Sequence, residues 1–375
     1  MSKTMIYADH AATTAVSLAA YEAMLPWLQD KYGNPSTLYS LARDPRKAVA
    51  QSREVIAASI HADPREIIFT SGGTEADNWA LKGTLFQHER GAGIITSTIE
   101  HHAILNSCSA LEKMGYRVIK LPVDREGLVD PESLRSKLKS DTSLVSVMLA
   151  NNEIGTIEPI AELAQIAHQA NALFHTDAVQ AIGHIPVDVR VLQVDMLSAS
   201  AHKFNGPKGI GFLYVRNGTP LVPLLDGGGQ ERGMRAGTEN VAGIVGMAVA
   251  LKEHIDHLSS EAEYLTRLSD RLIAKLNSLD LDFHVNGSHY RIPGSLSLSF
   301  KGADGEALLH RLDLMGTAVA TGSACDSKDA VLSHVIQAID VSDDYAHGTI
   351  RVTLGMDNTE EQVDIIAHQI SGILR

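Results

Sequence analysis

Short apolar runs alternate with helix-spaced segments between about residues 15 and 260. The runs at 94–97, 116–121, 144–149 and 211–215 have the length of buried strands, whereas 160–170 has helical spacing. Strands that alternate with helices are typical of a mostly parallel sheet with helices on both faces. The pattern therefore predicts an α/β unit over residues 15–260.

The pattern changes beyond that unit. Residues 241–277 have the spacing of a long, partly amphipathic helix, which we expect to bridge two domains. Residues 295–300 alternate with a period of two, which predicts a half-buried strand, and helix patterns and a strand at 349–354 follow. Because 375 residues exceed one usual hydrophobic core, we expect a second, smaller α+β domain over 261–375.

Composition narrows the class of protein. The formal net charge of −13 argues against general nucleic-acid binding, and no apolar stretch reaches the ~20 residues that cross a bilayer. The N-terminus lacks the apolar run of a signal peptide, and two cysteines cannot form a disulfide framework. Zinc and P-loop motifs are missing from the sequence. We expect a cytoplasmic protein without a metal, membrane or nucleic-acid partner.

Lys203 lies just after the apolar run 194–199, within the segment SAHKFNGPKG at 200–209. A lysine at the end of a buried strand must find a partner, lose its proton or form a covalent bond. A Schiff base to the aldehyde of pyridoxal phosphate does the last of these. Ser200 and His202 could both donate hydrogen bonds to a phosphate, which favours this interpretation over a solvated loop lysine.

Two further segments fit the same cofactor. Asp177 ends another apolar strand, where its carboxylate could lie beside a pyridine nitrogen, and Gln180 could reach the ring hydroxyl; a helix N-cap is the alternative role for Asp177. Residues 67–78 predict a strand, a glycine turn and a helix start. Free N–H groups at Gly73 and Thr74 would then form a phosphate cup, although the turn could equally be an ordinary one.

Together these segments and others, in order along almost the whole chain, resemble the cysteine desulfurases. These are class V aminotransferases within the fold-type I pyridoxal phosphate enzymes. The matching blocks lie at 7–14, 33–36, 70–78, 100–103, 151–156, 175–180, 200–211, 227–233, 235–240, 321–325, 333–335 and 350–355.

The resemblance implies a fold and a domain division. It implies a large pyridoxal-phosphate-binding domain over 15–260, with a mostly parallel seven-stranded sheet flanked by helices. It also adds the N-terminal segment 1–14 to the small domain at 261–375, which carries the catalytic cysteine loop.

The resemblance also implies the reaction and its residues. Free L-cysteine would displace Lys203 from the cofactor, and Arg351 would pair with the substrate carboxylate in two-point fashion. Asn152 and Asn34 would help to hold the carboxylate or the cofactor. His101 would stack on the pyridine ring and shuttle protons.

The cofactor phosphate would be held by several residues at once. Thr74, Ser200 and His202 are the candidates within one chain. In the family, a threonine of the Arg-x-Gly-Thr block reaches the phosphate of the neighbouring subunit, so Thr238 implies a homodimer.

Cys325 is the expected sulfur acceptor within the protein. Its thiolate would attack the substrate sulfur and leave L-alanine and a persulfide for an acceptor protein in iron–sulfur cluster, thio-tRNA or thiamin synthesis. The polar and small residues around Cys325 argue against a buried packing role, which we assign to Cys108 instead.

Three positions depart from the family pattern. His10 stands where asparagine is common, Asp326 follows the cysteine in place of a small hydroxyl residue, and Ala236 replaces a frequent serine. None removes a residue of the expected mechanism.

Two other functions compete with this interpretation. A selenocysteine lyase or another β-lyase could use the same scaffold, but such an enzyme could do without Cys325. A non-catalytic sulfur-assembly scaffold would not need Lys203, Asp177, Arg351 and Cys325 together.

Overall fold

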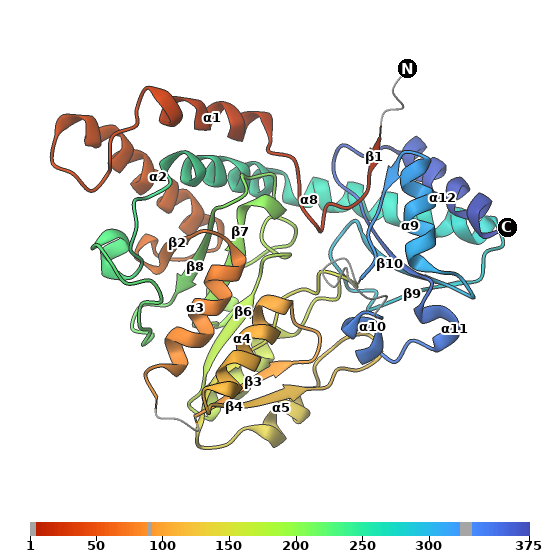
Figure 1. Ribbon diagram of the computed structural model, residues 1–375, viewed down its shortest axis with the longest axis horizontal. Helices are drawn as coiled ribbons and strands as arrows, with labels where there is room; N and C mark the ends of the chain where they lie inside the picture. Colours follow the sequence, from red (N-terminus) through yellow and green to blue (C-terminus); the bar gives the residue numbers. More distant parts are fainter. Residues whose placement is uncertain (1–4, 89–91, 323–331) are drawn as a thin grey trace.

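The computed structural model describes residues 5–88, 92–322 and 332–375. Its largest sheet has seven strands in the order β2-β8-β7-β6-β5-β3-β4 (Figure 1). Their bounds are β2 Ile67–Thr70, β3 Gly93–Ser97, β4 Arg117–Leu121, β5 Thr142–Ser146, β6 Leu173–Asp177, β7 Met196–Ser200 and β8 Gly211–Val215. β8 runs antiparallel to both of its neighbours, and the other pairs are parallel. The predicted mostly parallel sheet is confirmed.

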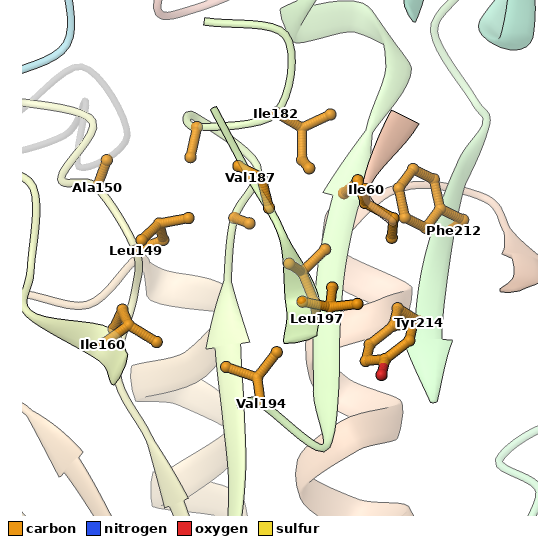
Figure 2. Close-up of a cluster of buried hydrophobic side chains, with 14 of the residues drawn as sticks. Ile60, Leu149, Ala150, Ile160, Ile182, Val187, Val194, Leu197, Phe212 and Tyr214 are labelled. Carbon is orange, nitrogen blue, oxygen red and sulfur yellow. The ribbon is translucent and has the colours of Figure 1, made fainter. Parts of the chain in front are cut away.

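Helices cover both faces of this sheet, as expected for parallel strands whose residues are mostly buried. One face packs against α2 (Arg43–Ser59), α6 (Ile160–Gln169) and the first half of α8 (Val241–Ser278), and Figure 2 shows part of this core. The other face packs against α3 (Gly73–Leu85) and α4 (His102–Lys113). Cys108 is fully buried in this second core, as its predicted packing role requires.

A separate hydrophobic core lies around two smaller sheets, away from the large sheet. β9 (Phe283–Val285), β10 (Ser295–Phe300) and β12 (Thr349–Thr353) form an antiparallel sheet, and β1 (Ile6–Tyr7) pairs in parallel with β11 (Thr317–Ala318). This core includes Ile6 and Ala8 from the N-terminal segment and the last third of α8. Figure 1 shows α8 running from beside α2 to beside α12 (Glu360–Leu374), so the division at residue 260 stays a prediction.

The expectation that residues 295–300 form a half-buried strand is wrong, because all six residues of β10 are buried. Its leucines face the apolar core, whereas Ser297 and Ser299 accept hydrogen bonds from the buried Asn286 amide at 3.1 and 2.7 Å. The alternation of leucine and serine in β10 therefore separates an apolar buried side from a polar buried side, and neither side faces solvent.

The remaining elements are connections and outer helices. They are α1 Leu18–Gln29, α5 Pro131–Lys137, α7 Val189–Leu192, α9 Gly305–Leu314, α10 His334–Ala338, α11 Asp343–Ala346 and the 3-10 turns η1 Ser40–Ala42, η2 Pro64–Glu66, η3 Ala201–Lys203 and η4 Gln230–Gly233. Among the described residues, no helix combines the length and apolar character needed to cross a membrane.

Candidate active site

A cavity of about 590 Å³ lies where the large sheet meets the small sheets. Its walls come from the carboxyl ends of β6 and β7, the start of α3, the start of α4, the N-terminal segment and β12. β6 and β7 are parallel neighbours, so Asp177 at the end of one and Lys203 just after the other face the same space. Ligands of open α/β sheets bind at such carboxyl ends.

Lys203 is the last residue of η3, the turn that follows β7. Its Nζ donates hydrogen bonds to the carbonyl oxygens of Ala11 and Ala12, at 2.6 and 2.7 Å. The N-terminal segment therefore holds the amine at the cavity wall, a contact that the strand-end position alone does not predict.

Asp177 is buried, and its Oδ1 accepts a hydrogen bond from the backbone N–H of Val179 at 2.9 Å. It caps no helix, so the alternative role as an N-cap is wrong. Burial raises the pKa of Asp177, while the neighbouring His101 and Lys203 act against that rise. Gln180, three residues on, donates its side-chain N–H to Ala11 O at 2.9 Å.

The start of α3 forms a narrow cradle beside these residues. A Cβ on Gly73 would lie 2.6 Å from Val179 Cγ2, so only glycine fits there. Gly72 is the N-cap with φ +147°, and among the described residues no side chain caps this helix start. Uncapped N–H groups at a helix N-terminus favour an anion. The cradle, with Thr74 and Ser200 in the cavity lining, fits the phosphate of pyridoxal phosphate.

His202 borders the same cradle. Its Nδ1 lies 3.1 Å from Thr13 Oγ1. Burial, with the positive charges of Lys203 and Lys208, lowers the pKa of His202 to about 4. The ring is therefore neutral at pH 7 and offers one N–H donor.

His101 is the N-cap of α4, and its Nδ1 accepts a hydrogen bond from Ala103 N–H at 3.1 Å. That bond leaves the ring proton of the neutral form on Nε2. Burial and the charge of Lys203 lower the pKa of His101, while Asp177 raises it. The side chain lines the cavity together with His102 and His334.

Arg351 reaches the cavity from β12 and is buried. Its Nη1 donates to the backbone oxygen of Asn152 at 2.9 Å, and its Nη2 lies 2.7 Å from Asp9 Oδ1. Its Nε has no hydrogen-bond partner in the described part of the chain. The contact to Asp9 is one that sequence reasoning missed, although Asp9 lies in the matched block 7–14.

Two predicted residues lie outside this cavity. Thr238 is exposed, and Asn34 accepts a hydrogen bond from Ser36 N–H, whose own hydroxyl donates to Glu239 at 3.3 Å. The two segments thus contact each other away from the cavity. Cys325 lies outside the described residues, although Thr321 and Gly322 just before it line the cavity.

His10, the first departure from the family pattern, is absent from the lining of the main cavity. Its Nε2 lies 3.2 Å from Asp357 Oδ1, and its ring packs against Gly355. It borders a small neighbouring cavity with His184.

Sequence reasoning also missed the buried acids of this site. Glu100, Asp77 and Glu153 all line the cavity with almost no exposure. Burial raises the pKa of Glu100 to about 8, against hydrogen bonds from Ser97 and from the Met148 backbone. Their place in the blocks 70–78, 100–103 and 151–156 is the only sequence signal for them. Within the described ranges, no group of three or more side chains could hold a metal ion.

A family model described as aminotransferase class-V matches residues 6–366 of this chain. Among curated proteins, a cysteine desulfurase IscS of Dictyoglomus turgidum is 51% identical over 364 residues, which cover 96% of this chain and 92% of that protein. A cysteine desulfurase IscS of Clostridium botulinum is 46% identical, with coverage of 99% and 94%.

Solved structures agree with these relatives. A NifS-like protein is 39% identical and superposes with a TM-score of 0.93, with 99% of both chains covered. SspA, solved in complex with cysteine, is 35% identical and superposes with a TM-score of 0.84, with 93% of this chain and 99% of that one covered.

Proposed function

Because the chain belongs to the aminotransferase class-V family and is a pyridoxal-phosphate-dependent cysteine desulfurase, we propose how its own side chains divide the work of that activity. The observation that carries the proposal is the meeting of Lys203, Asp177 and the Gly73 cradle in one cavity.

Residues at the carboxyl edge of the large sheet and in the turns and helix starts beside it would hold the cofactor. Thr74, Ser200 and His202 would bind its phosphate at the open start of α3, together with the N–H groups near Gly73. Asp177 would pair with its ring nitrogen, Gln180 would reach its ring hydroxyl, and His101 would stack on its ring. When bound, the cofactor supplies the electron sink that weakens the bonds at the α-carbon of the substrate.

Lys203 would hold the cofactor covalently through its amine, and its Nζ would move protons at the substrate. Its Nζ must leave the carbonyl oxygens of Ala11 and Ala12 to do so. These two carbonyl oxygens hold the amine at the cavity wall.

Arg351 binds the carboxylate of L-cysteine. Its unpartnered Nε and remaining N–H groups are the donors for this contact, while Asp9 and the Asn152 backbone fix the guanidinium plane. Asn152 also helps to hold the substrate from its place in the cavity wall.

Cys325 receives the sulfur. Its thiolate attacks the substrate sulfur, an S–S bond forms, and the C–S bond breaks to leave L-alanine after protonation of the β-carbon. His101, with its Nε2 proton, is the proton donor that we assign to this step. The persulfide then passes to a sulfur-acceptor protein, which we propose as the physiological partner.

We also propose a homodimer in which Asn34 and Thr238 act in the site of the other subunit. Exposed apolar side chains on and around α1 support this, since a monomer rarely leaves so many together. They are Leu18, Tyr21, Leu25, Leu28, Tyr32, Leu38 and Tyr39. The segment of Thr238 is held against the first turn of α3 by Arg235, whose Nε lies 2.9 Å from Glu75 Oε1.

One assay tests this assignment against the β-lyase alternative. L-cysteine should give L-alanine and, in a first turnover without added thiol, one persulfide on Cys325. The control is the Lys203→Ala variant, which should give neither. Pyruvate, ammonia and free sulfide in place of alanine would contradict the proposal and favour a lyase.

A further inference from the structure

A buried ion pair joins the helix α2 to the turn η4. Arg53 on α2 and Glu231 on η4 contact each other at two points: Nη1 lies 2.7 Å from Oε2, and Nη2 lies 2.6 Å from Oε1. The side chain of Glu231 is only 4% exposed, and that of Arg53 is 12% exposed. A two-point contact between planar groups fixes their orientation as well as their distance.

The same pair is bonded to the backbone of β2. Glu231 Oε2 accepts a hydrogen bond from Phe69 N–H at 3.0 Å, and Arg53 Nη1 donates to Ile67 O at 2.6 Å. The guanidinium of Arg53 also lies 4.4 Å from the centre of the Phe69 ring. Arg232, the next residue of the turn, donates from Nη2 to Ile67 O at 3.0 Å. These contacts fix η4 to a buried strand of the large sheet.

The backbone of η4 is strained where the pair holds it. Glu231 has φ +44° and Arg232 has φ +59°, so two consecutive residues with side chains adopt the left-handed region. This conformation is unfavourable for residues that carry a Cβ, and it persists only where surrounding contacts enforce it. The contacts of Glu231 with Arg53 and with β2 enforce it here, so we expect the turn to relax when the carboxylate is removed.

Two further contacts extend this hold along the chain to Thr238. Gln230 Oε1 accepts a hydrogen bond at 3.1 Å from the N–H of Gly237, the residue directly before Thr238. Arg235 binds Glu75 in the first turn of α3, with Nε 2.9 Å from Oε1 and Nη2 3.1 Å from Oε2. The exposed Thr238 therefore lies on a loop whose conformation is fixed by contacts within one chain.

We propose that Glu231 is a positioning residue for the cofactor site of the other subunit, because it holds residues 230–238 in the conformation that presents Thr238 to that site. The inference rests on the proposed homodimer in which Thr238 acts in the neighbouring site. Burial and the charge of Arg53 lower the pKa of Arg232, and the charge of Glu231 acts against this effect. Without the carboxylate, two guanidinium groups would repel each other beside β2.

A purely structural role for the pair makes a different prediction. If Arg53 and Glu231 only stabilised their own domain, a change at Glu231 would act on the cofactor site of its own subunit. Presentation of Thr238 predicts that the change acts on the site of the partner. The two roles can therefore be separated by placing substitutions on chosen subunits of a dimer.

Hydrogen exchange of the purified holoenzyme tests the hold on the loop. In Glu231→Ala, the amides of residues 230–238 should exchange about fivefold faster than in the wild type, because the contacts that fix the turn are lost. Asp195→Ala is the matched control: Asp195 is also buried, pairs with Arg216 and accepts a hydrogen bond from Phe174 N–H at 2.7 Å. It should leave the exchange of 230–238 unchanged. Wild-type exchange of this loop in Glu231→Ala would overturn the proposal.

Mixed dimers with one Lys203→Ala subunit have a single working site and show which subunit Glu231 serves. With Glu231→Ala on the Lys203→Ala chain, the working site belongs to the wild-type partner and receives the altered loop. Half-maximal activity should then need about tenfold more added pyridoxal phosphate, as for the loss of one hydrogen bond to a charged group. With the two changes on opposite chains, the working site receives an intact loop and should need no more cofactor than wild type. Equal requirements in both arrangements would contradict the proposal.

Thr238→Ala in the same two arrangements separates this inference from the proposed function. No difference between the arrangements for Thr238→Ala would refute the shared site, and the exchange of 230–238 would still decide whether Glu231 holds the loop. A difference for Thr238→Ala but not for Glu231→Ala would leave the shared site standing and refute this inference. Should Glu231→Ala fail to fold, Glu231→Gln removes the charge at nearly the same size and serves in both measurements.

Discussion

The cofactor cavity and the surface around Asn34 and Thr238 both carry residues of the matched motifs, yet they differ in how far one chain completes them. In the cavity, Asp177 and Arg351 are both buried: Asp177 accepts a hydrogen bond from the nearby Val179 N–H, and Arg351 contacts Asp9, which is 342 residues away in the sequence. Around Thr238 the side chain is exposed, and Leu38 nearby in sequence to Asn34 is 99% exposed. A sequence motif therefore indicates which residues take part in the reaction. The burial of those residues indicates whether one subunit completes their site by itself.

The largest expected effect lies inside the cavity. Lys203→Ala should reduce turnover by more than about a thousandfold, because this change removes the amine that attaches the cofactor and moves protons. Alanine formation and the visible absorption of the purified protein measure it. Lys208→Ala is the control, since Lys208 lines the same cavity but its Nζ lies 3.5 Å from Thr14 O. Covalent cofactor found on Lys208 after borohydride reduction would refute the assignment.

A second large effect separates binding from sulfur transfer. Cys325→Ser should still bind L-cysteine, seen as a change in cofactor absorption, but should form no alanine without added thiol. Cys108→Ser should retain most activity, because Cys108 is buried in the core and burial raises its pKa to about 12. Accordingly, iodoacetamide at pH 7 should label Cys325 and spare Cys108 in the folded protein. Alanine production by Cys325→Ser at the wild-type rate would instead indicate a lyase.

A substitution of Thr238 tests whether the exposed surface around Asn34 and Thr238 takes part in cofactor binding. Thr238→Ala should weaken cofactor binding about tenfold, which corresponds to the loss of one hydrogen bond to a charged group. The partly exposed Thr219 supplies a control threonine, and Thr219→Ala should leave the affinity unchanged.

Mixed dimers make this test decisive. A Lys203→Ala subunit paired with a Thr238→Ala subunit should regain up to one intact site. No recovery in verified mixed dimers would show that Thr238 acts within its own subunit or not at all.

The smallest effect concerns Asp326. A carboxylate next to Cys325 opposes formation of the thiolate, so Asp326→Ser should speed alkylation of Cys325 by a factor of about three. The change should be clearest at low salt, because salt screens exposed charges. The alkaline rise of the alkylation rate should move to lower pH, since the thiol loses its proton more easily. An unchanged pH profile would mean that Asp326 does not act on the sulfur.

Much of the fold could be predicted because most strands of the large sheet contain short runs of apolar residues. The runs at 94–97 and 211–215 became β3 and β8 almost unchanged, and 160–170 became α6. The pattern failed at β10, where serines that alternate with leucines are buried against Asn286. An alternating pattern shows that polar and apolar side chains point to opposite sides of the strand. It does not show whether the polar side faces water or a buried amide such as that of Asn286.

The sequence by itself determined which chemical groups the site contains. Lys203 and the glycine turn at 72–73 follow buried strands, and Asp177 ends one. β6 and β7 are parallel neighbours, and β2 runs in the same direction on the far side of β8, so all three strands end at the same edge of the sheet. The tertiary structure alone decided the partners of such groups: Ala11 and Ala12 for Lys203, and Asp9 for Arg351. Such contacts join segments up to 342 residues apart. These contacts depend on how the helices and sheets pack against one another, and a local sequence pattern does not predict that packing.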